Sequence, residues 1–341
     1  MTWESLWYGP RGWRTAVLAP ALAPLSWLYS AGVAARNAAF SLGLRRPVRV
    51  GGAMVISVGN LLVGGAGKTP VAIFLARWAS ACGRKVAVLS RGYGRASTQE
   101  VHFTSAHLPA VEAVGDEPRL IARRCPGVEV WVGAKRASLA LAARERGADF
   151  LLLDDGFQHR QLHRDVDLVV LSEAGNGHRL PWGPLRESPA ALSRATLTWA
   201  AAGASGEAIA HVRSRLAATA LIEANGEQRP VESLRGRAVV LLAGIARPER
   251  VVRTLEALGA RIAHVHAYVD HHAFSRMELE KAQATARKHG ALLVTTEKDR
   301  ERLPDGLDAL ALRVELEVTH GLDALARALG LDEALVHSSR G

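Results

Sequence analysis

The sequence predicts an α/β protein built on parallel sheets, and three observations lead to this prediction. Short apolar segments alternate with longer stretches of helical periodicity along most of the chain. The apolar segments are nearly continuous, as in strands that are covered on both faces. A glycine-rich turn, VGNLLVGGAGKTP at 58–70, stands between an apolar strand and a helical stretch, the arrangement of a P-loop NTPase-type domain.

Length and composition favour an ordered protein of two domains. The chain has 341 residues, of which 48% are hydrophobic, so it can bury substantial cores. Cys82 and Cys125 are its two cysteines, which excludes a disulfide framework and a zinc cluster. A reducing, cytosolic environment is the simplest interpretation.

The N-terminal segment is basic and apolar together. The net charge is +10, and residues 1–50 hold six arginines against one acid. Residues 15–35 carry no charge, and Pro24 suits the first turn of a helix that continues to about Phe40. Arginines beside tryptophans are typical of an anionic membrane surface. A membrane-docking helix is therefore predicted; a buried structural helix, a membrane span and a secretory signal are the alternatives. The apolar run is unlike a nucleic-acid arm, so no nucleic-acid partner is expected.

The order of the segments predicts two α/β domains with a hairpin between them. A helix is expected at 69–82, and Asn225-Gly226 is a strong hairpin turn. Strands are expected at 53–58, 85–90, 128–132, 150–155, 167–172, 238–244, 291–296 and 311–318. The predicted parts are a membrane-associating segment (1–50), a P-loop domain (51–216), a hairpin linker (217–235) and a smaller C-terminal α/β domain (236–341).

The glycine-rich turn predicts a nucleotide site. Free backbone N–H groups and the helix dipole converge at such a turn, and glycines let phosphate oxygens approach. Lys68 would neutralise the β- and γ-phosphates, and the Thr69 hydroxyl would coordinate Mg²⁺. Leu62 stands where the strict motif has glycine, and a turn without a ligand is the alternative. The predicted nucleotide contacts are Gly64, Gly65, Ala66, Gly67, Lys68, Thr69 and Pro70.

A strand that ends in acids supports the nucleotide prediction. Asp154 and Asp155 close the apolar run at 150–155. P-loop proteins place there the carboxylate that holds the magnesium shell, at the sheet edge where ligands bind. Both are predicted at the metal, and two solvated turn acids are the alternative.

Seven motifs in order along the chain together resemble the tetraacyldisaccharide 4'-kinase family, the lipid A 4'-kinases of Gram-negative bacteria. They are VGNLLVGGAGKTP (58–70), LSRGYGR (89–95), VGDEP (114–118), LLDDGFQHR (152–160), GNGHRLPWGPLRES (175–188), DHHAF (270–274) and TTEKD (295–299). The resemblance runs from residue 58 to 299, and the basic, apolar N-terminus is similar as well. The family shares the missing first glycine of the loop.

The resemblance implies a reaction and a place in the cell. The γ-phosphate of ATP would pass, with Mg²⁺, to the 4'-hydroxyl of a tetraacylated glucosamine disaccharide 1-phosphate. The enzyme would be peripheral, on the cytoplasmic face of the bacterial inner membrane. Its two α/β domains would be joined by a two-stranded linker, which coincides with the hairpin expected at Asn225-Gly226.

The resemblance also implies roles for individual residues. Asp116 of VGDEP matches a general base for the sugar hydroxyl, and His271 of DHHAF matches a histidine that supports this carboxylate. The two would come from domains on either side of the linker. Glu187 of LRES matches an acid of the magnesium site. From the residues alone, Asp116 is equally a helix N-cap, and His271 with neighbouring histidines is a conceivable metal cluster.

Some positions depart from the usual family pattern. LRES stands where LREP is common, Trp182 where a smaller residue is common, and AGIARPERV (243–251) where a GNPERF-like run is common. The last two departures concern contacts with the sugar or acyl chains. A membrane-peripheral P-loop ATPase or GTPase that acts as a switch or metallochaperone is the alternative function. VGDEP and DHHAF favour the kinase, because they have a ready role in activating an acceptor.

Overall fold

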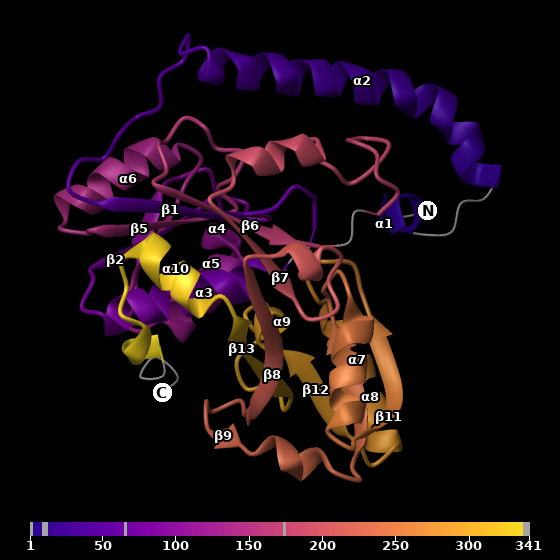
Figure 1. Ribbon diagram of the computed structural model, residues 1–341. Helices are drawn as coiled ribbons and strands as arrows, with labels where there is room; N and C mark the ends of the chain where they lie inside the picture. Colours follow the sequence, from indigo (N-terminus) through magenta and orange to yellow (C-terminus); the bar gives the residue numbers. More distant parts are fainter. Residues whose placement is uncertain (1–2, 9–12, 65–66, 173–174, 337–341) are drawn as a thin grey trace. The chain divides into compact units, whose positions relative to one another are not determined.

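A computed structural model describes residues 3–8, 13–64, 67–172 and 175–336 (Figure 1). The chain forms two compact units. Unit 1 comprises Met1–Arg91, Gly133–Arg215 and Val318–Gly341, and unit 2 comprises Gly92–Val132 and Leu216–Glu317. Residues 92–132 therefore group with the later segment, whereas the sequence placed them in the P-loop domain. The boundaries at 51–216, 217–235 and 236–341 stay a prediction.

Unit 1 is built on a parallel sheet. Its strands pair in the order β7-β6-β1-β5-β2, every pair parallel, and the first residues of β8 pair in parallel with β7. The bounds are β1 Met54–Gly59, β2 Val86–Ser90, β5 Phe150–Asp154, β6 Val166–Leu171, β7 Leu197–Ala201 and β8 Val212–Ile222. The central strands are buried along nearly their whole length, which explains their continuous apolar sequence.

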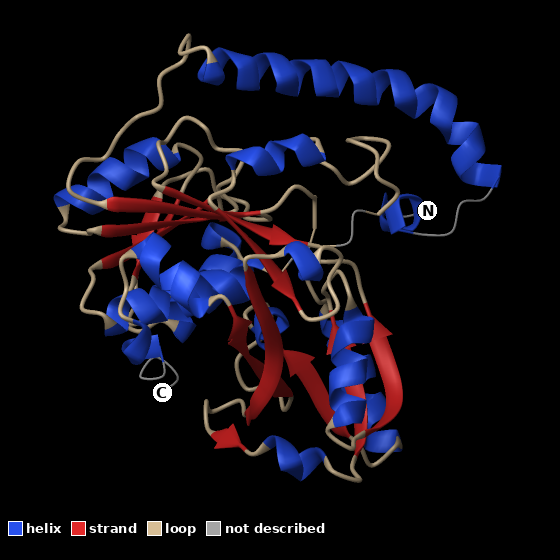
Figure 2. Ribbon diagram, viewed as in Figure 1, coloured by secondary structure: helices blue, strands red, loops and turns tan. Residues whose placement is uncertain are grey.

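Helices α3 (Lys68–Ala81) and α6 (Arg136–Glu145) pack on this sheet (Figure 2). Trp78 of the helix after β1 is fully buried, and Phe74 lies between it and Trp199 of β7, with ring centroids 5.8 and 5.9 Å apart. These aromatic contacts hold that helix, α3, in place behind the loop that precedes it. The bounds are α1 Trp3–Tyr8, α3 Lys68–Ala81, α6 Arg136–Glu145, α10 Leu322–Leu329 and the 3-10 helices Pro189–Arg194, Glu207–Ile209 and Glu333–Val336.

The N-terminal helix is longer than expected. Helix α2 spans Trp13–Ser41 and contains Pro20 and Pro24, whereas the sequence placed Pro24 in its first turn. The start was therefore predicted wrongly. Proline lacks an N–H group, and inside a helix it can bend the helix without ending it. Figure 1 shows that α2 curves toward its N-terminal end. No helix among the described residues is both long and apolar enough to cross a bilayer.

Unit 2 is built on a second parallel sheet, in the order β11-β10-β12-β13. Alternate residues of β10 face opposite sides. Val239 and Leu241 pack with Leu255 of α7, whereas Val240 and Leu242 pack with residues of α8. Helices therefore cover both faces of the sheet. The bounds are β10 Ala238–Ala243, α7 Pro248–Ala257, β11 Arg261–Ala267, α8 Arg276–Lys288, β12 Leu292–Thr296, α9 Glu297–Arg300 and β13 Leu310–His320.

The remaining elements of unit 2 comprise two antiparallel strand pairs and short helices. The turn at Asn225-Gly226 joins β8 to β9, as predicted. The segment predicted as a strand at 128–132 is β4, and its antiparallel partner β3 was not predicted. Both strands are short, and pairing direction is a tertiary property. The bounds are β3 Val101–Phe103, α4 Val111–Val114, α5 Asp116–Arg124, β4 Glu129–Val132, β9 Gln228–Arg229 and the 3-10 helix Val231–Leu234.

Candidate active site

The loop after β1 is held tightly on one side. Gly59 ends β1, and a Cβ atom added there would lie 2.5 Å from Cβ of Phe157. Only glycine permits this close approach. The next residue, Asn60, is fully buried, and its backbone carbonyl accepts a hydrogen bond from Gln158 Nε2 at 2.9 Å. The loop that follows β5 thus supports the start of the glycine-rich turn.

Lys68 is placed at the first position of α3. Its Nζ lies 3.3 Å from Asn60 Oδ1 and 3.4 Å from Asp155 Oδ1. Asp155 also receives a hydrogen bond from Arg186 NH1 at 2.7 Å. Burial alone would raise the pKa of Asp155, but the charges of Lys68 and Arg186 outweigh it and hold this pKa below its ordinary value. Asp155 is therefore a carboxylate in this structure.

The turn has the features that phosphate binding requires. Gly64 (φ 106°) and Gly67 (φ 78°) have left-handed backbone, which only glycine adopts readily, and Gly67 is the N-cap of α3. Asn60 Nδ2 and Ser57 Oγ are buried without a hydrogen-bond partner beside it. Gly65 and Ala66 lie outside the described residues. Hydrogen-bond donors without a partner, together with the backbone N–H groups at the start of α3, are suited to binding an anion.

The residues predicted at the magnesium ion occupy different surroundings. Thr69 lies in the first turn of α3, and Asp154 is the last residue of β5, opposite Val58 of β1. Glu187 is buried next to Arg186, and Asn37 Nδ2 and Arg194 NH2 donate to it at 2.8 and 2.9 Å. Thr69 and Asp154 therefore lie at the elements that flank the turn, whereas Asp155 and Glu187 each already pair with a cationic side chain.

No three His, Cys, Asp or Glu side chains gather as a metal site in the part of the chain that the structure describes. The histidines of unit 2 have other contacts, since the rings of His264 and His266 stack edge to face and His272 Nε2 lies 3.1 Å from Glu278. The histidine metal cluster, an alternative interpretation of the sequence, is therefore not supported. Magnesium commonly uses one or two carboxylates together with substrate phosphates, so it does not need such a group.

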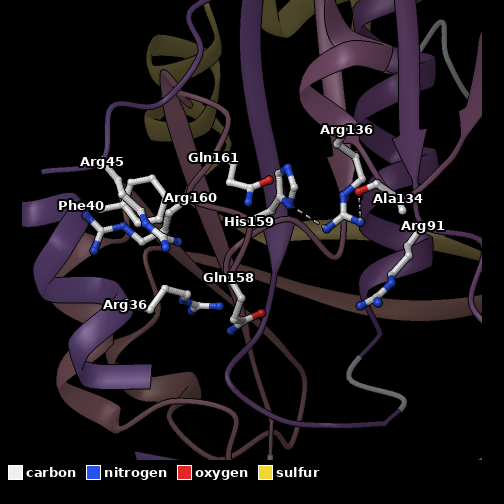
Figure 3. Close-up of a pocket in the computed structure, with 10 residues that line it drawn as sticks. All are labelled: Arg36, Phe40, Arg45, Arg91, Ala134, Arg136, Gln158, His159, Arg160 and Gln161. Atoms are coloured by element: carbon white, nitrogen blue, oxygen red, sulfur yellow. Dashed lines mark hydrogen bonds between the residues drawn. The ribbon is translucent and has the colours of Figure 1, made fainter. Parts of the chain in front are cut away.

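A cationic pocket lies in unit 1 (Figure 3). Its volume is about 230 Å³, and its lining contains no acid. In the close-up, the side chains from α2 and Arg160 stand on one side of the pocket, and His159 points toward Arg136 on the other. The lining residues are Arg36, Phe40, Arg45, Arg91, Ala134, Arg136, Gln158, His159, Arg160 and Gln161. Arg36 pairs with Glu187 at 3.5 Å, and a gathering of arginines such as this one is typical of an anion site.

The pKa values of two residues that line the pocket are lowered by the positive charges around them. Burial and the neighbouring Arg91 lower the pKa of Arg136 to about 10. Burial and the charge of Arg136 lower the pKa of His159 to about 3, so His159 is neutral, and its Nδ1 lies 2.9 Å from Arg136 NH2. A bound anion would relieve the repulsion between these groups.

Asp116 and His271 are in contact within unit 2. His271 Nδ1 lies 3.0 Å from both carboxylate oxygens of Asp116. Asp116 is 2% exposed and is the first residue of α5. Gly115 precedes it with φ 90°, and a Cβ there would lie 2.9 Å from the carbonyl oxygen of Tyr93. Gly115 occupies the N-cap position, but Asp116 Oδ1 accepts the backbone N–H of Glu117 at 2.8 Å, so the alternative was wrong in position and right that this carboxylate satisfies an N–H group of the first turn.

Three further side chains complete this cluster. Arg302 Nε lies 3.2 Å from Asp116 Oδ2, and Lys298 Nζ lies 3.3 Å from His271 Nε2. Asp299 accepts a hydrogen bond from the backbone of Gly244 and pairs with Arg302. Burial alone would raise the pKa of Asp116, but the hydrogen bond from His271 and the charges of Lys298 and Arg302 outweigh it and lower this pKa. Asp116 is therefore a carboxylate.

The structure thus brings Asp116 and His271 together, but inside one unit. The sequence expected them from two domains; the strand pair β3–β4 and helix α5 group with the later segment instead. Lys298 belongs to the TTEKD motif, whose role the sequence left open, and the Arg302 contact was missed. The spacing of Asp299 and Arg302, three apart at a helix end, was the available signal.

Backbone conformation marks two of the predicted site residues. Within the described ranges, the non-glycine residues with positive φ are Asp155 (φ 56°) and His271 (φ 61°). Such a conformation is strained for these residues and is retained where surrounding contacts hold it. The backbone N–H of His271 donates to the carbonyl of Gly244 at 3.1 Å. A strained backbone at both residues is consistent with a site in which the direction of each side chain is fixed.

Comparisons with known proteins agree with this geometry. The sequence profile described as "Tetraacyldisaccharide-1-P 4'-kinase" (LpxK) matches residues 18–330. The tetraacyldisaccharide 4'-kinase of Anaeromyxobacter dehalogenans strain 2CP-C is 47% identical, over 96% of this chain and 94% of that protein. The protein of that name from Syntrophus aciditrophicus is 39% identical, over 91% of this chain and 92% of that protein.

A solved structure is similar over nearly the whole chain. LpxK from Aquifex aeolicus in complex with ATP superposes with a TM-score of 0.74 and 27% identity, covering 95% of this chain and 99% of that one. The α/β fold with a P-loop at the start of α3 is therefore shared with a kinase that binds ATP. The family match, the relatives and this fold together lead to one conclusion: the chain belongs to the tetraacyldisaccharide-1-P 4'-kinase family.

Proposed function

We propose that the chain transfers the γ-phosphate of ATP to the 4'-hydroxyl of a tetraacylated glucosamine disaccharide 1-phosphate, a lipid A precursor. The observation that carries the proposal is a phosphate-binding turn with Lys68 at its end in a chain matched to this family over residues 18–330. The turn and Lys68 would bind the β- and γ-phosphates of ATP, and Lys68 would neutralise charge on the transferring group.

Asp116 is the proposed general base. It is a buried carboxylate that His271 contacts directly, and it can accept the proton of the attacking hydroxyl. Thr69, with Asp154 or Asp155, would hold Mg²⁺, which offsets charge on the phosphates when bound. The predicted place of Glu187 at this ion receives no support from its contacts with Asn37 and Arg194.

The arginine pocket of unit 1 would bind a phosphate group of one of the two substrates. Its arginines carry bidentate donors that suit phosphate, and no acid of the lining competes for them. The nucleotide and the 1-phosphate of the acceptor share this chemistry. Kinetics with each substrate varied in turn distinguishes the two sources.

We expect Arg136→Met to raise the KM of one substrate by roughly ten- to a hundredfold, because a charge-assisted hydrogen bond to phosphate is lost. A raised KM for ATP alone would place the nucleotide in the pocket, and a raised KM for the lipid alone would place its 1-phosphate there. The matched control is Arg146→Met, an exposed arginine at the end of the same helix. Unchanged KM values for both substrates would contradict the phosphate pocket.

Helix α2 is the proposed contact with the cytoplasmic face of the inner membrane. Trp27 and Leu28 are 75% and 72% exposed on it, and Leu25 is exposed nearby. Other residues of this helix contact the rest of unit 1. Ser26 Oγ donates to the backbone carbonyl of Arg179, and Tyr29 Oη donates to the backbone carbonyl of Arg186. Exposed apolar side chains beside arginines suit an interfacial helix that lies on anionic lipid.

Replacing Trp27 and Leu28 by serine should release the protein from anionic lipid vesicles and raise the KM for the acylated substrate, with ATP binding unchanged. Apolar area that enters the interface is lost, while the contacts of Ser26 and Tyr29 remain. Vesicle sedimentation measures the binding. Ile209→Ser is the matched control, since Ile209 is 76% exposed in unit 1 outside α2. If the double variant sediments like the control, α2 is not the membrane contact.

The reaction itself is tested with γ-³²P-labelled ATP and the purified acylated disaccharide 1-phosphate. Label that moves to the lipid, at the 4'-position, supports the proposal. Label released to water at the same rate with and without the lipid would instead indicate an ATPase. Omission of the disaccharide is the control for water as the acceptor.

A further inference from the structure

We propose that Lys298 holds His271 as the neutral imidazole with its proton on Nδ1, so that His271 donates to Asp116 and does not itself take up the proton of the reaction. The inference concerns a positioning residue, and its kinetic part rests on the proposed role of Asp116 as the base.

The argument begins with the ammonium group of Lys298. An ammonium group has three N–H donors and no acceptor. Three acceptors surround it: Glu117 Oε1 at 3.1 Å, Asp270 Oδ1 at 3.1 Å and His271 Nε2 at 3.3 Å. Lys298 is largely buried there, and the charges of Glu117 and Asp270 outweigh burial and raise its pKa. It therefore stays charged and can only donate.

The protonation of His271 follows from this contact. Because Lys298 donates, Nε2 of His271 must present its lone pair. Nδ1 then carries the ring proton and donates to the carboxylate of Asp116, which lies 3.0 Å away. A second proton on Nε2 would face the ammonium group at 3.3 Å, and the nearer alternative acceptor, Asp270 Oδ2, is 3.7 Å away, beyond hydrogen-bond distance.

Charged groups from every neighbouring element affect whether His271 is protonated. Asp116 and Glu117 come from α5, Lys298 comes from α9, Arg302 follows α9, and Asp270 precedes His271. The ring of Tyr93 lies 5.2 Å from that of His271. The three acids favour an imidazolium ion, and the two cations oppose it. Lys298 is the cation that contacts His271, and it does so at Nε2, the nitrogen that faces away from Asp116.

The consequence concerns the basicity of Asp116. An imidazolium partner in addition to Arg302 would stabilise the carboxylate further and weaken it as a base. A neutral imidazole orients the carboxylate and stabilises it less. Lys298 thereby keeps a neutral, oriented imidazole against Asp116 and does not contact Asp116 itself, while its own charge contributes to the lowered pKa of that carboxyl.

The test uses ¹⁵N NMR of the histidine side chains in the full chain, with His271→Gln to assign the signal. In the wild type at neutral pH, we expect a protonated nitrogen at Nδ1 and an unprotonated nitrogen at Nε2. In Lys298→Met, the imidazolium form should persist to a pH higher by about one to three units, because a nearby positive charge is gone. Lys298→Arg should retain the wild-type signals.

The outcomes separate this inference from the proposed function. Lys281 is exposed on α8, and Lys281→Met is the control for the loss of a lysine. An imidazolium ion or an Nε2 proton in the wild type would overturn the proposal even if Lys298→Met fails to fold, and so would unchanged titration in a folded Lys298→Met.

If the tautomer is as expected, the kcat–pH profile of Lys298→Met should also change between pH 5 and 8, and an unchanged profile would refute the positioning role. A chain that phosphorylates no lipid would refute the proposed function, and the spectra would still report on His271.

Discussion

Lys68→Ala should lower the rate of phosphoryl transfer by at least about 100- to 1000-fold, the usual effect of removing one group that stabilises the transition state. Among the described residues, Lys68 Nζ contacts the polar groups of Asn60 and Asp155 at 3.3 and 3.4 Å, so little apolar packing is lost. Asp155 keeps its hydrogen bond from Arg186, and the fold should persist. Single-turnover transfer of label from ATP to lipid measures the rate.

Two control variants define this result. Lys85→Ala removes an exposed lysine of the same unit and should leave the rate unchanged. Lys68→Arg keeps the charge but not the compact ammonium group, and its rate should stay far below wild type. Near-normal transfer by Lys68→Ala with unchanged thermal unfolding would refute the assignment of the turn as the site of the transferring phosphate.

Asp116→Ala and His271→Ala should each lower kcat by about 100-fold or more, with little change in the KM for ATP, because the base contacts the acceptor hydroxyl. Since their side chains form one hydrogen-bonded pair at 3.0 Å, the double variant should be scarcely slower than the slower single variant. Steady-state kinetics of the three proteins tests this. Glu112→Ala and His289→Ala, both exposed in unit 2, are the controls. Additive losses would show that the two residues act separately.

The lowered pKa of Asp116 also predicts a pH dependence of stability. Its carboxylate is favoured in the folded protein, so it contributes stability above the pKa of unfolded aspartate, near 3.9, which is lost as the pH falls through the lower folded value. Asp116→Asn should therefore be less stable than wild type at pH 7, and the difference should shrink below about pH 4. Urea unfolding at both pH values measures it. A difference that grows toward acid would contradict the sign of the shift.

Much of the fold was predictable because its signals are local. Apolar runs marked β1, β5 and β10 to within a residue or two, and Asn225-Gly226 marked its hairpin. Strands β7 and β11 were missed, since LTWAA and RIAHVHA are short or alternate with polar residues. The start of α2 was misplaced because a proline signal was given more weight than the helical turns before it. Strand β3 was missed because it has only three residues, and no local pattern indicates that it pairs with β4.

The sequence by itself determined the P-loop, the acidic end of β5 and the motifs that identify the family, because these depend on residue types at fixed short spacings. Only the tertiary structure decided that Asp116 and His271 meet within one unit, that Lys298 and Arg302 flank them, and that Glu187 accepts hydrogen bonds from Arg194 and Asn37. These contacts join residues more than a hundred positions apart or depend on side-chain direction. Burial removes water as the alternative partner, so the charge of each group is set by neighbours that only the folded chain supplies.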